Sequence, residues 1–480
     1  MKLPPKTSTA LLPWAKKNGI EVIDLKFVDL FGRWHHISLP GSRMNSDLFT
    51  RGVAFDGSSV PGFKKLEAGD MVLLPDPKTA SLDPFWEKKT LSLICQPAEA
   101  DTRKAFWKDP RAIMLNAEAW MREMGIADQS EWGPEFEFYI VDSVSYRNEI
   151  NEAFYRIDSA EADWNSAVDE GKNLGYKIPH QGGYHAIPPH DQLYDLRAEM
   201  VAEIEKAGIA VRYHHHEVGG PGQSEIEIEE SPLTLVGDNA MRIKYIIKMV
   251  AARANKTVTF MPKPLFNEAG SGMHFHQRLR KGNKNLFWDA KGYAGLSKTA
   301  LHYIGGLLQH APALLAFTNP STNSYKRLVP GFEAPVRTFF GLANRSAAVR
   351  IPKYANTAAT KRIEFRPPDA SCNIYLAIAA QLMAGLDGIR RKLDPTELGF
   401  GPIDTNIYEL SDSDLDRIGG LPTSLREAMV ALNEDRDFLL EGGVFPEELI
   451  DFWIETKMEK EYNEVRNRPH PYELSLYFDV

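Results

Sequence analysis

The sequence has few cysteines, and the two it contains are isolated. Cys95 and Cys372 are far apart in a chain of 480 residues and neither has a CxxC partner. This pattern argues against zinc–thiolate chemistry and against a disulfide framework, and it predicts a reducing compartment such as the cytoplasm. We interpret Cys372 as a small buried residue ahead of an apolar helix.

Long apolar runs and excess positive charge are also missing. No stretch approaches the roughly 20 apolar residues of a membrane-spanning helix, and residues 1–5 form no apolar signal region. The formal net charge of -9 gives no basic surface for nucleic acid. We therefore expect a soluble, cytoplasmic protein that binds neither membranes nor nucleic acid.

The length and the patterning predict two α+β domains, because a single hydrophobic core stops growing well below this size. Residues 1–105 form a small domain with strands expected at 21–27, where polar and apolar residues alternate and predict alternating exposure, and at 34–39, 71–74 and 91–95. Residues 106–480 form the larger domain, with helices expected at 111–124, 191–207, 233–254, 296–310 and 373–392. Asp109 should cap the first of these helices, with Pro110 in its first turn. The apolar end of the chain, 474–478, is expected either to contact another subunit or to pack on its own domain.

Four short segments alternate acid, histidine or arginine with bulky apolar residues, at 135–138, 225–228, 274–276 and 362–366. Neighbouring side chains in a strand point to opposite faces, so each segment buries its apolar residues and presents the others on a polar face. Strands with one polar face are typical of antiparallel sheets whose other face packs on helices. Glutamates two positions apart lie about 7 Å apart along a strand, a separation that suits two neighbouring ions.

The ligand types on these segments favour Mg²⁺ or Mn²⁺. Carboxylates with one or two imidazoles suit small hard cations, and no thiolate is present to select a soft one. For one segment alone, a solvated acidic face is the simpler interpretation, but four such segments favour a multi-metal site. His214, His215 and His216 are adjacent and cannot all converge, so we interpret most of these histidines as structural.

Five arginines occur within forty residues: Arg327, Arg345, Arg350, Arg362 and Arg366. Guanidinium groups match phosphate and carboxylate geometry, and metals with arginines stabilise phosphoryl transfer. The combination indicates ATP chemistry on an anionic substrate, although surface ion pairs are the alternative for any one arginine. No Walker A, kinase glycine loop or GxGxxG motif occurs, so an unfamiliar frame should hold the nucleotide.

Taken in order along nearly the whole chain, the motifs resemble type I glutamine synthetase of the bacterial form. They are Phe55-Asp56-Gly57-Ser58-Ser59, Gly133-Pro134-Glu135-Phe136-Glu137, His215-His216-Glu217-Val218, Gly222-Gln223-Ser224-Glu225, Gly270-Ser271-Gly272-Met273-His274, Asn319-Pro320 with Lys326 to Pro335, Asn344-Arg345-Ser346, and Arg362-Ile363-Glu364-Phe365-Arg366-Pro367-Pro368-Asp369.

The resemblance implies a small N-terminal β-grasp domain and a large catalytic domain of antiparallel strands backed by helices. It also implies a homo-oligomer, a dodecamer of two six-membered rings with active sites between ring neighbours. The implied partners are glutamate, ammonium and ATP, with two or three Mg²⁺ or Mn²⁺ ions per subunit.

The resemblance also assigns roles to single residues. Glu137, Glu217 and Glu225 would hold one metal, and Glu135, His274 and Glu364 would hold the nucleotide-linked metal. Gly270, Arg327, Glu333 and Arg366 would bind the substrate, and His276, Arg345, Arg350 and Arg362 the nucleotide and its phosphates. Asp56 would be the base that deprotonates ammonium, and the loop of Glu333 would exclude water from γ-glutamyl phosphate. Tyr408 would be adenylylated by an adenylyltransferase.

Four positions depart from the family pattern: Ala269, Arg212, Arg278 and Ala359. They affect the expected contacts to glutamate, adenine and ribose more than the metal chemistry. Two other functions stay open from the sequence. One is γ-glutamyl ligation of a different amine, such as a polyamine, and the other is a non-catalytic ring-forming protein.

Overall fold

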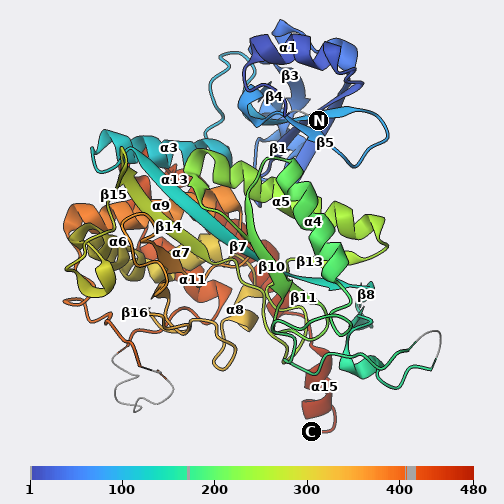
Figure 1. The fold of residues 1–480 in the computed structure, drawn as a ribbon, viewed down its shortest axis with the longest axis vertical. Helices are drawn as coiled ribbons and strands as arrows, with labels where there is room; N and C mark the ends of the chain where they lie inside the picture. The colour runs from blue at the N-terminus through green and yellow to red at the C-terminus, as the bar shows by residue number, and fades with distance from the viewer. Residues whose placement is uncertain (1–2, 170–172, 406, 408–417) are drawn as a thin grey trace.

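The computed structural model describes residues 3–169, 173–405, 407 and 418–480. Tyr408 lies outside the described residues. The chain forms a small N-terminal sheet domain and a much larger body, which meet at α4 (Tyr194–Lys206) and α5 (Leu233–Arg253) (Figure 1). Among the described residues, no helix has both the length and the apolarity needed to cross a bilayer.

The small domain is a six-stranded sheet with α1 (Ser8–Lys17) beside it. Its strands are β1 (Val22–Val28), β2 (Trp34–Pro40), β3 (Val53–Asp56), β4 (Asp70–Pro75), β5 (Ser81–Asp83) and β6 (Thr90–Glu99). The order is β2-β1-β6-β4-β3, with β5 paired to β6. The central β1 and β6 are parallel, and the remaining pairs are antiparallel. The four predicted strands are present, whereas the short β3 and β5 were not predicted.

The first strand was expected to alternate between buried and exposed residues, and this was wrong. Every residue of β1 from Ile23 onward is buried, including Asp24 and Lys26. Lys26 Nζ donates to Asp83 at 3.0 Å. The charged residues of the pattern therefore face the junction with the large domain, where they are paired, instead of facing water.

The large domain has a ten-stranded sheet in the order β10-β11-β7-β14-β18-β17-β16, with β12 and β13 paired to β7 and β15 to β14. Its strands are β7 (Gln129–Val141), β10 (Val211–His216), β11 (Gln223–Ile228), β12 (Ser231–Pro232), β13 (Thr257–Thr259), β14 (Phe275–Lys281), β15 (Lys284–Asn285), β16 (Phe340–Leu342), β17 (Val349–Ile351) and β18 (Ile363–Phe365). Neighbours are antiparallel except β16 and β17, which are parallel. The predicted α+β class is confirmed, with this one exception in strand direction. A separate hairpin, β8 (Ser143–Asn148) and β9 (Ala153–Asp158), lies outside the sheet.

Helices cover the face of this sheet that the apolar side chains occupy. Besides α4 and α5, the longer ones are α3 (Pro110–Glu123), α6 (Lys298–Gln309), α7 (Ala311–Thr318), α9 (Ile374–Arg391), α11 (Leu425–Glu434) and α13 (Glu447–Thr456). The shorter ones in the chain are α2 (Ser46–Thr50), α8 (Ser324–Arg327), α12 (Asp437–Leu440), α14 (Asn463–Arg466) and α15 (Pro471–Tyr477). All five predicted helices are present within a few residues of the expected ends.

Local signals explain where two of these helices begin. The Asp109 carboxylate accepts hydrogen bonds from the N–H groups of Arg111 and Ala112, so it caps α3 as predicted. Asn373 caps α9 in the same way, and Cys372 beside it is buried. Helix α9 is the centre of the core, with every residue from Ile374 to Gly388 buried. Its close crossing with α6 requires glycine, since a Cβ on Gly388 would lie 2.2 Å from the His302 carbonyl oxygen.

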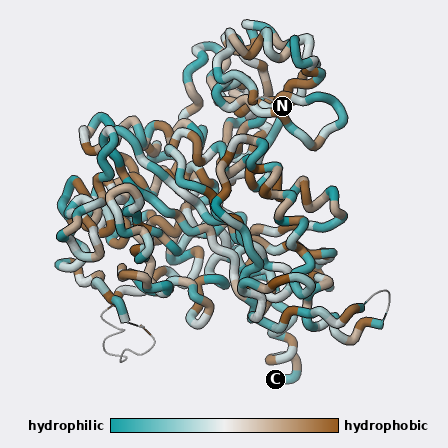
Figure 2. The backbone as a smooth tube through the Cα atoms, in the orientation of Figure 1, coloured by the Kyte–Doolittle hydropathy of each residue, from teal (hydrophilic) through white to brown (hydrophobic). Residues whose placement is uncertain are grey.

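The C-terminal helix α15 projects from the body (Figure 1) and carries hydrophobic residues (Figure 2). The side chains of Leu474, Leu476, Tyr477 and Phe478 are all exposed, Phe478 at 85%. Of the two expectations for this segment, packing on its own domain is therefore not what the structure shows.

His310 joins three helices through a buried ion-pair network. It lies between α6 and α7, with Nε2 at 2.9 Å from Asp387 on α9 and Nδ1 at 2.7 Å from Asp435 after α11. Burial alone would lower the pKa of this imidazole, but the hydrogen bonds that its ring N–H groups donate to the two carboxylates outweigh burial and raise the pKa above 6.5.

The raised pKa makes part of the stability pH-dependent. The folded state binds the His310 proton more tightly than the unfolded state does. The stability that the charged imidazole contributes is therefore fully present below the unfolded pKa of 6.5. It is lost as pH rises through the folded pKa, by about 1.4 kcal/mol for each pH unit between the two pKa values. We expect His310→Gln to lower the free energy of unfolding by about 2 kcal/mol near neutral pH. Thermal unfolding should show this deficit shrinking as pH rises.

His302→Gln on the same helix α6 is the matched control, because His302 forms no ion pair among the described residues. A deficit for His310→Gln that stays constant with pH would contradict the assignment of a charged imidazole.

Candidate metal and nucleotide centre

A cavity of about 730 Å³ lies over the polar face of the large sheet. We call it the acidic cavity. Its acidic and imidazole residues on the sheet come from β7, β10, β11, β14, β18 and the residues next to them: Glu135, Glu137, His215, Glu217, Glu225, Glu227, His274 and Glu364. The sheet register brings them together, since Glu225 pairs with Glu137 and Glu227 with Glu135.

Glu135, His274 and Glu364 form one compact group, as the resemblance implies. Their nearest ligand atoms all lie within 4.8 Å of one another. His274 Nδ1 is 2.8 Å from Glu135 Oε2 and 3.8 Å from Glu364 Oε1. His276 Nε2 is 2.9 Å from the other Glu135 oxygen, so His276 orients a ligand of this group.

The second group differs from the implied set. Glu217 and Glu225 lie with His215, again within 4.8 Å, and His215 Nε2 is 3.4 Å from Glu225. Glu137 lies between the two groups, 3.8 Å from His274 Nδ1, with its Oε2 accepting a 2.7 Å hydrogen bond from the Gly272 N–H.

The sequence interpretation missed His215 because it treated the three adjacent histidines alike. His215 faces Glu225 across the β10–β11 pair, so it shares the polar face, while His216 is buried. The alternation Tyr213, His215, Glu217 was the available signal.

Carboxylates crowd one another around Glu217 and Glu225. Burial, followed by repulsion from Glu137, raises the pKa of Glu217 to about 7. Burial and then repulsion from three neighbouring glutamates raise the pKa of Glu225 well above its usual range. A divalent cation would relieve this repulsion, and oxygen-rich donor sets with one imidazole fit Mg²⁺ or Mn²⁺. The residues present therefore fit the metals that were expected.

The predicted arginines line the same cavity, and three of them already form close ion pairs. Arg350 and Arg366 both pair with Glu364. Their charges, Arg366 first, outweigh burial and hold the pKa of Glu364 at about 2. Arg362 is 2.9 Å from Glu230.

Arg327 and Gly270 are in close contact at one end of the cavity. Arg327 is buried and donates from Nη1 to the Pro367 carbonyl at 2.7 Å, and its Nη2 is 3.2 Å from His274 Nε2. A Cβ on Gly270 would lie 2.6 Å from Arg327 Cγ. Glycine at this position is therefore what allows the guanidinium to reach the cavity.

Glu333 lies on an exposed loop at the rim of the acidic cavity. Its φ is 53°, a left-handed conformation that costs a non-glycine residue free energy. Its carboxylate is 3.9 Å from Arg345 Nη1. The neighbouring Phe332 packs its ring against the Lys263 ammonium at 3.7 Å. The Glu333 carbonyl accepts a hydrogen bond from Arg366 Nη2 at 3.3 Å, which ties this loop to the cavity.

The four residues that depart from the family pattern form ion pairs or hydrogen bonds with other residues of the large domain. Arg212 forms ion pairs with three glutamates, Glu227, Glu229 and Glu230. Arg278 is 2.5 Å from Glu131 and donates to the Ala359 carbonyl. The Ala269 carbonyl accepts a 2.6 Å hydrogen bond from Tyr139. Arg212 therefore lines the cavity beside Glu227, and its charge is paired with these glutamates.

Asp56 is the predicted residue that the structure does not bring to the acidic cavity of its own chain. It lies at the end of β3 in the small domain and is exposed. The hydroxyls of Ser58 and Ser59 and the Ser58 N–H donate to it, and these hydrogen bonds, the Ser58 hydroxyl first, hold the pKa of its carboxyl below the usual range. Asp56 is therefore an ionised carboxylate in water.

The acidic cavity combines glutamates, imidazoles and arginines on a mainly antiparallel sheet next to a small mixed-sheet domain, a set of side chains suited to an enzyme that binds divalent cations and anionic substrates. The family description "Glutamine synthetase, catalytic domain" matches residues 107–477, and "Glutamine synthetase, beta-Grasp domain" matches residues 19–99. The chain belongs to the glutamine synthetase family, in its type I form. It catalyses ATP-dependent ligation of ammonium to glutamate.

Proteins with similar sequences or structures match this chain over nearly its full length. The chain is 48% identical to glutamine synthetase of Mycolicibacterium smegmatis over 479 residues, covering 99% of each chain. It is 48% identical to that of Aquifex aeolicus over 478 residues, covering 100% of both. A solved structure of Plasmodium falciparum glutamine synthetase superimposes with a TM-score of 0.89 at 28% identity, covering 99% of this chain and 100% of that one.

His215 can be tested as a metal ligand. If it binds the ion held by Glu217 and Glu225, His215→Ala should weaken Mn²⁺ affinity by about tenfold, measured by titration of the purified enzyme. His214→Ala is the control, because His214 is next along β10 and points to the other face. Equal Mn²⁺ affinity in the two variants would show that His215 is not a ligand of the ion.

Proposed function

We propose that the acidic cavity holds ATP, glutamate and at least two divalent cations, Mg²⁺ or Mn²⁺. The observation that carries this proposal is the convergence of eight acidic or imidazole side chains from separate strands, together with the five predicted arginines, on one cavity of about 730 Å³. Glu135, His274 and Glu364 would hold one ion. Glu137, Glu217 and Glu225, joined by His215, would hold the other. Bound cations would supply charge stabilisation for phosphoryl transfer.

The arginines would bind the anionic groups of both substrates. Arg327 and Arg366, with the backbone at Gly270, would hold the carboxylates of glutamate. Arg345, Arg350 and Arg362 would neutralise the phosphates, with His276 on the nucleotide side. The existing ion pairs of Arg350 and Arg366 with Glu364 support this role, because the guanidinium groups are already oriented in the cavity.

The reaction would proceed in two steps. A γ-carboxylate oxygen of glutamate attacks the γ-phosphorus of ATP, and ADP leaves, giving γ-glutamyl phosphate. Ammonium then loses a proton to Asp56, because only neutral ammonia has a lone pair. Ammonia attacks the carbonyl carbon of γ-glutamyl phosphate, the C–O bond to phosphate breaks, and the departing phosphate takes up the proton that the nitrogen loses as the amide forms. The Glu333 loop would close during this step and exclude water.

The exposure of Asp56 away from its own acidic cavity supports an oligomer in which it serves a neighbouring subunit. We propose a dodecamer of two hexameric rings. The exposed apolar residues of α15, together with Tyr146, Ile150 and Phe154 of the β8–β9 hairpin, are surfaces that such contacts would cover. The domain boundary at about residue 105 is proposed between the end of β6 and the start of α3.

Two further proposals rest on less structure. Tyr408 is proposed as an adenylylation position, and an AMP mass increase on Tyr408 after treatment with an adenylyltransferase would support it. A cytoplasmic location is proposed because ATP and glutamate are supplied there and both cysteines are free thiols.

Amine specificity gives the most direct test. Phosphate release from ATP with glutamate should be fastest with ammonium and slow with ethylamine, putrescine and aniline, because an anionic pocket for ammonium leaves little space for a substituent. Reactions without glutamate are the control. Faster turnover with putrescine than with ammonium would contradict the proposed ammonium pocket.

A further inference from the structure

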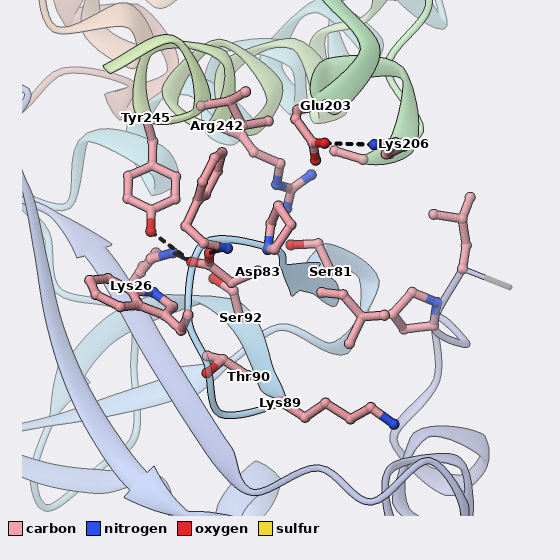
Figure 3. A pocket seen from close by; sticks show the side chains of 18 of the residues that line it. Lys26, Ser81, Asp83, Lys89, Thr90, Ser92, Glu203, Lys206, Arg242 and Tyr245 are labelled. Carbon is pink, nitrogen blue, oxygen red and sulfur yellow. Dashed lines mark hydrogen bonds and ion pairs between the residues drawn. The ribbon is translucent and has the colours of Figure 1, made fainter. Parts of the chain in front are cut away.

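A second cavity, of about 400 Å³, lies where the small domain meets α4 and α5 (Figure 3). We call it the junction cavity. It shares no lining residue with the acidic cavity, and the reaction proposed above does not use it. Its volume is within the range typical of small-molecule sites.

Most charged groups in the junction cavity already have partners. Asp83 accepts hydrogen bonds from Lys26 at 3.0 Å and from the Tyr245 hydroxyl at 2.8 Å. Glu203 is paired with Lys206 at 2.6 Å. These pairs neutralise one another, so they offer little attraction for an added charge.

Arg242 on α5 is different. Its Nη2 donates to the Thr79 carbonyl at 2.8 Å, and among the described residues no carboxylate lies within ion-pair distance of it. Arg242 is half-buried, and burial lowers the pKa of its guanidinium. Figure 3 shows the Arg242 side chain extending into the cavity toward Ser81. A guanidinium with free N–H groups beside a hydroxyl is an anion-binding arrangement.

The rest of the lining limits which anion fits. The walls are largely apolar and aromatic, and include Trp34, Leu82, Phe85, Tyr245 and Ile246. One guanidinium matches one carboxylate. Because Lys26 and Lys206 are paired with Asp83 and Glu203, Arg242 is the one lining cation without a carboxylate partner that the described residues place beside this apolar wall, and it balances a single negative charge.

We propose that the junction cavity is a second ligand site, specific for a small aromatic monocarboxylate whose carboxylate binds Arg242 and Ser81 and whose ring packs against the apolar wall of Leu82, Phe85 and Ile246. Such a ligand would contact both the small domain, which carries Asp56, and the helices that support the catalytic sheet.

Three matched probes test this proposal by calorimetry on the intact enzyme without turnover. They are 3-phenylpropanoate, 2-phenylethylamine, which replaces the carboxylate by an amine, and inorganic phosphate, which lacks the ring. We expect only 3-phenylpropanoate to bind. Saturating glutamate and ADP should not displace it, because they occupy the acidic cavity.

Arg242→Gln should weaken this binding by at least about tenfold. Lys248→Gln is the matched control, since Lys248 is a cation on the same helix but does not line the cavity. Ala207→Leu, which narrows the cavity at the end of α4 and leaves the guanidinium in place, should also abolish binding and guards against a misfolded Arg242 variant.

Three results would overturn the site: undiminished binding to Arg242→Gln, displacement by glutamate and ADP, or equal binding of 2-phenylethylamine. Binding of phosphate that depends on Arg242 would overturn the ligand class. None of these measurements uses catalysis, and only the displacement experiment rests on the proposed binding of glutamate and ADP in the acidic cavity.

Discussion

Glu364→Gln is expected to reduce turnover by about 1,000-fold. Glu364 is buried at the edge of both proposed binding regions, 3.8 Å from His274 and paired with Arg350 and Arg366. Removing its charge deprives the metal group of a ligand and leaves two guanidinium groups without their counter-charge. Phosphate release with saturating ATP, glutamate and ammonium measures the loss. Glutamine is preferred to alanine because the side chain is only 1% exposed and a cavity would add an unrelated stability cost.

Glu131→Gln is the matched control for this substitution. Glu131, on β7 of the same sheet, pairs with Arg278 and does not line the acidic cavity. Turnover should change little, while thermal unfolding of both variants verifies that they are folded. Comparable activity in Glu364→Gln and wild type would refute the assignment of Glu364 as a metal ligand.

Asp56→Asn is expected to reduce kcat/KM for ammonium by about 100-fold, because the variant can neither attract the cation nor accept its proton. The KM for ATP should be nearly unchanged, since Asp56 has no role in nucleotide binding. The hydrogen bonds from Ser58 and Ser59 keep the pKa of this carboxyl low, so the wild-type residue is ionised throughout the assay range. Initial rates against ammonium concentration at saturating ATP and glutamate give the measurement.

Asp47→Asn provides the control for the loss of one negative charge from the small domain, because Asp47 is exposed on α2 and forms only a long ion pair with Arg51 at 3.8 Å. Mixed oligomers give a sharper test of the subunit arrangement. If Asp56 serves a neighbouring acidic cavity, mixing Asp56→Asn and Glu364→Gln subunits should give more activity than either variant alone. Failure to recover activity from verified mixed oligomers would count against a shared site.

Glu364→Gln tests the chemistry within one subunit, whereas Asp56→Asn tests the proposed contact between subunits. Glu364 acts within one chain, where the sheet register alone brings it to His274 and Glu135. Asp56 is proposed to depend on a second chain, because its own fold places it at the exposed end of β3. The first variant therefore reports on the metal group of one subunit, and the second reports on the contact between subunits.

Alternation in the four acidic segments was sufficient to predict strands with a polar face. Each segment is indeed in or beside β7, β11, β14 or β18. The five predicted helices were equally accessible, since the spacing of apolar residues and caps such as Asp109 are local signals. Local patterning did not reveal β3 and β5, which are only four and three residues long.

Local sequence patterns could not show which of these acidic and imidazole side chains lie close together. His215 and Glu225 are ten positions apart in the chain, yet they face each other because β10 and β11 pair in one particular register. That register includes an irregularity between Val211 and Tyr213, which no alternation rule anticipates. A one-residue slip would have turned His215 to the other face of the sheet.

The sequence by itself determined the α+β class, the polar strands, the family and most of the residues of the acidic cavity, because side-chain alternation, helix periodicity and ordered motifs are encoded locally. The tertiary structure alone decided which ligands group together, that Lys26 and Asp83 are buried partners, and that Arg242 lacks a carboxylate among the described residues. Such facts depend on strand register and on the contact between domains, where residues far apart in the chain meet and burial changes the free energy of each charge.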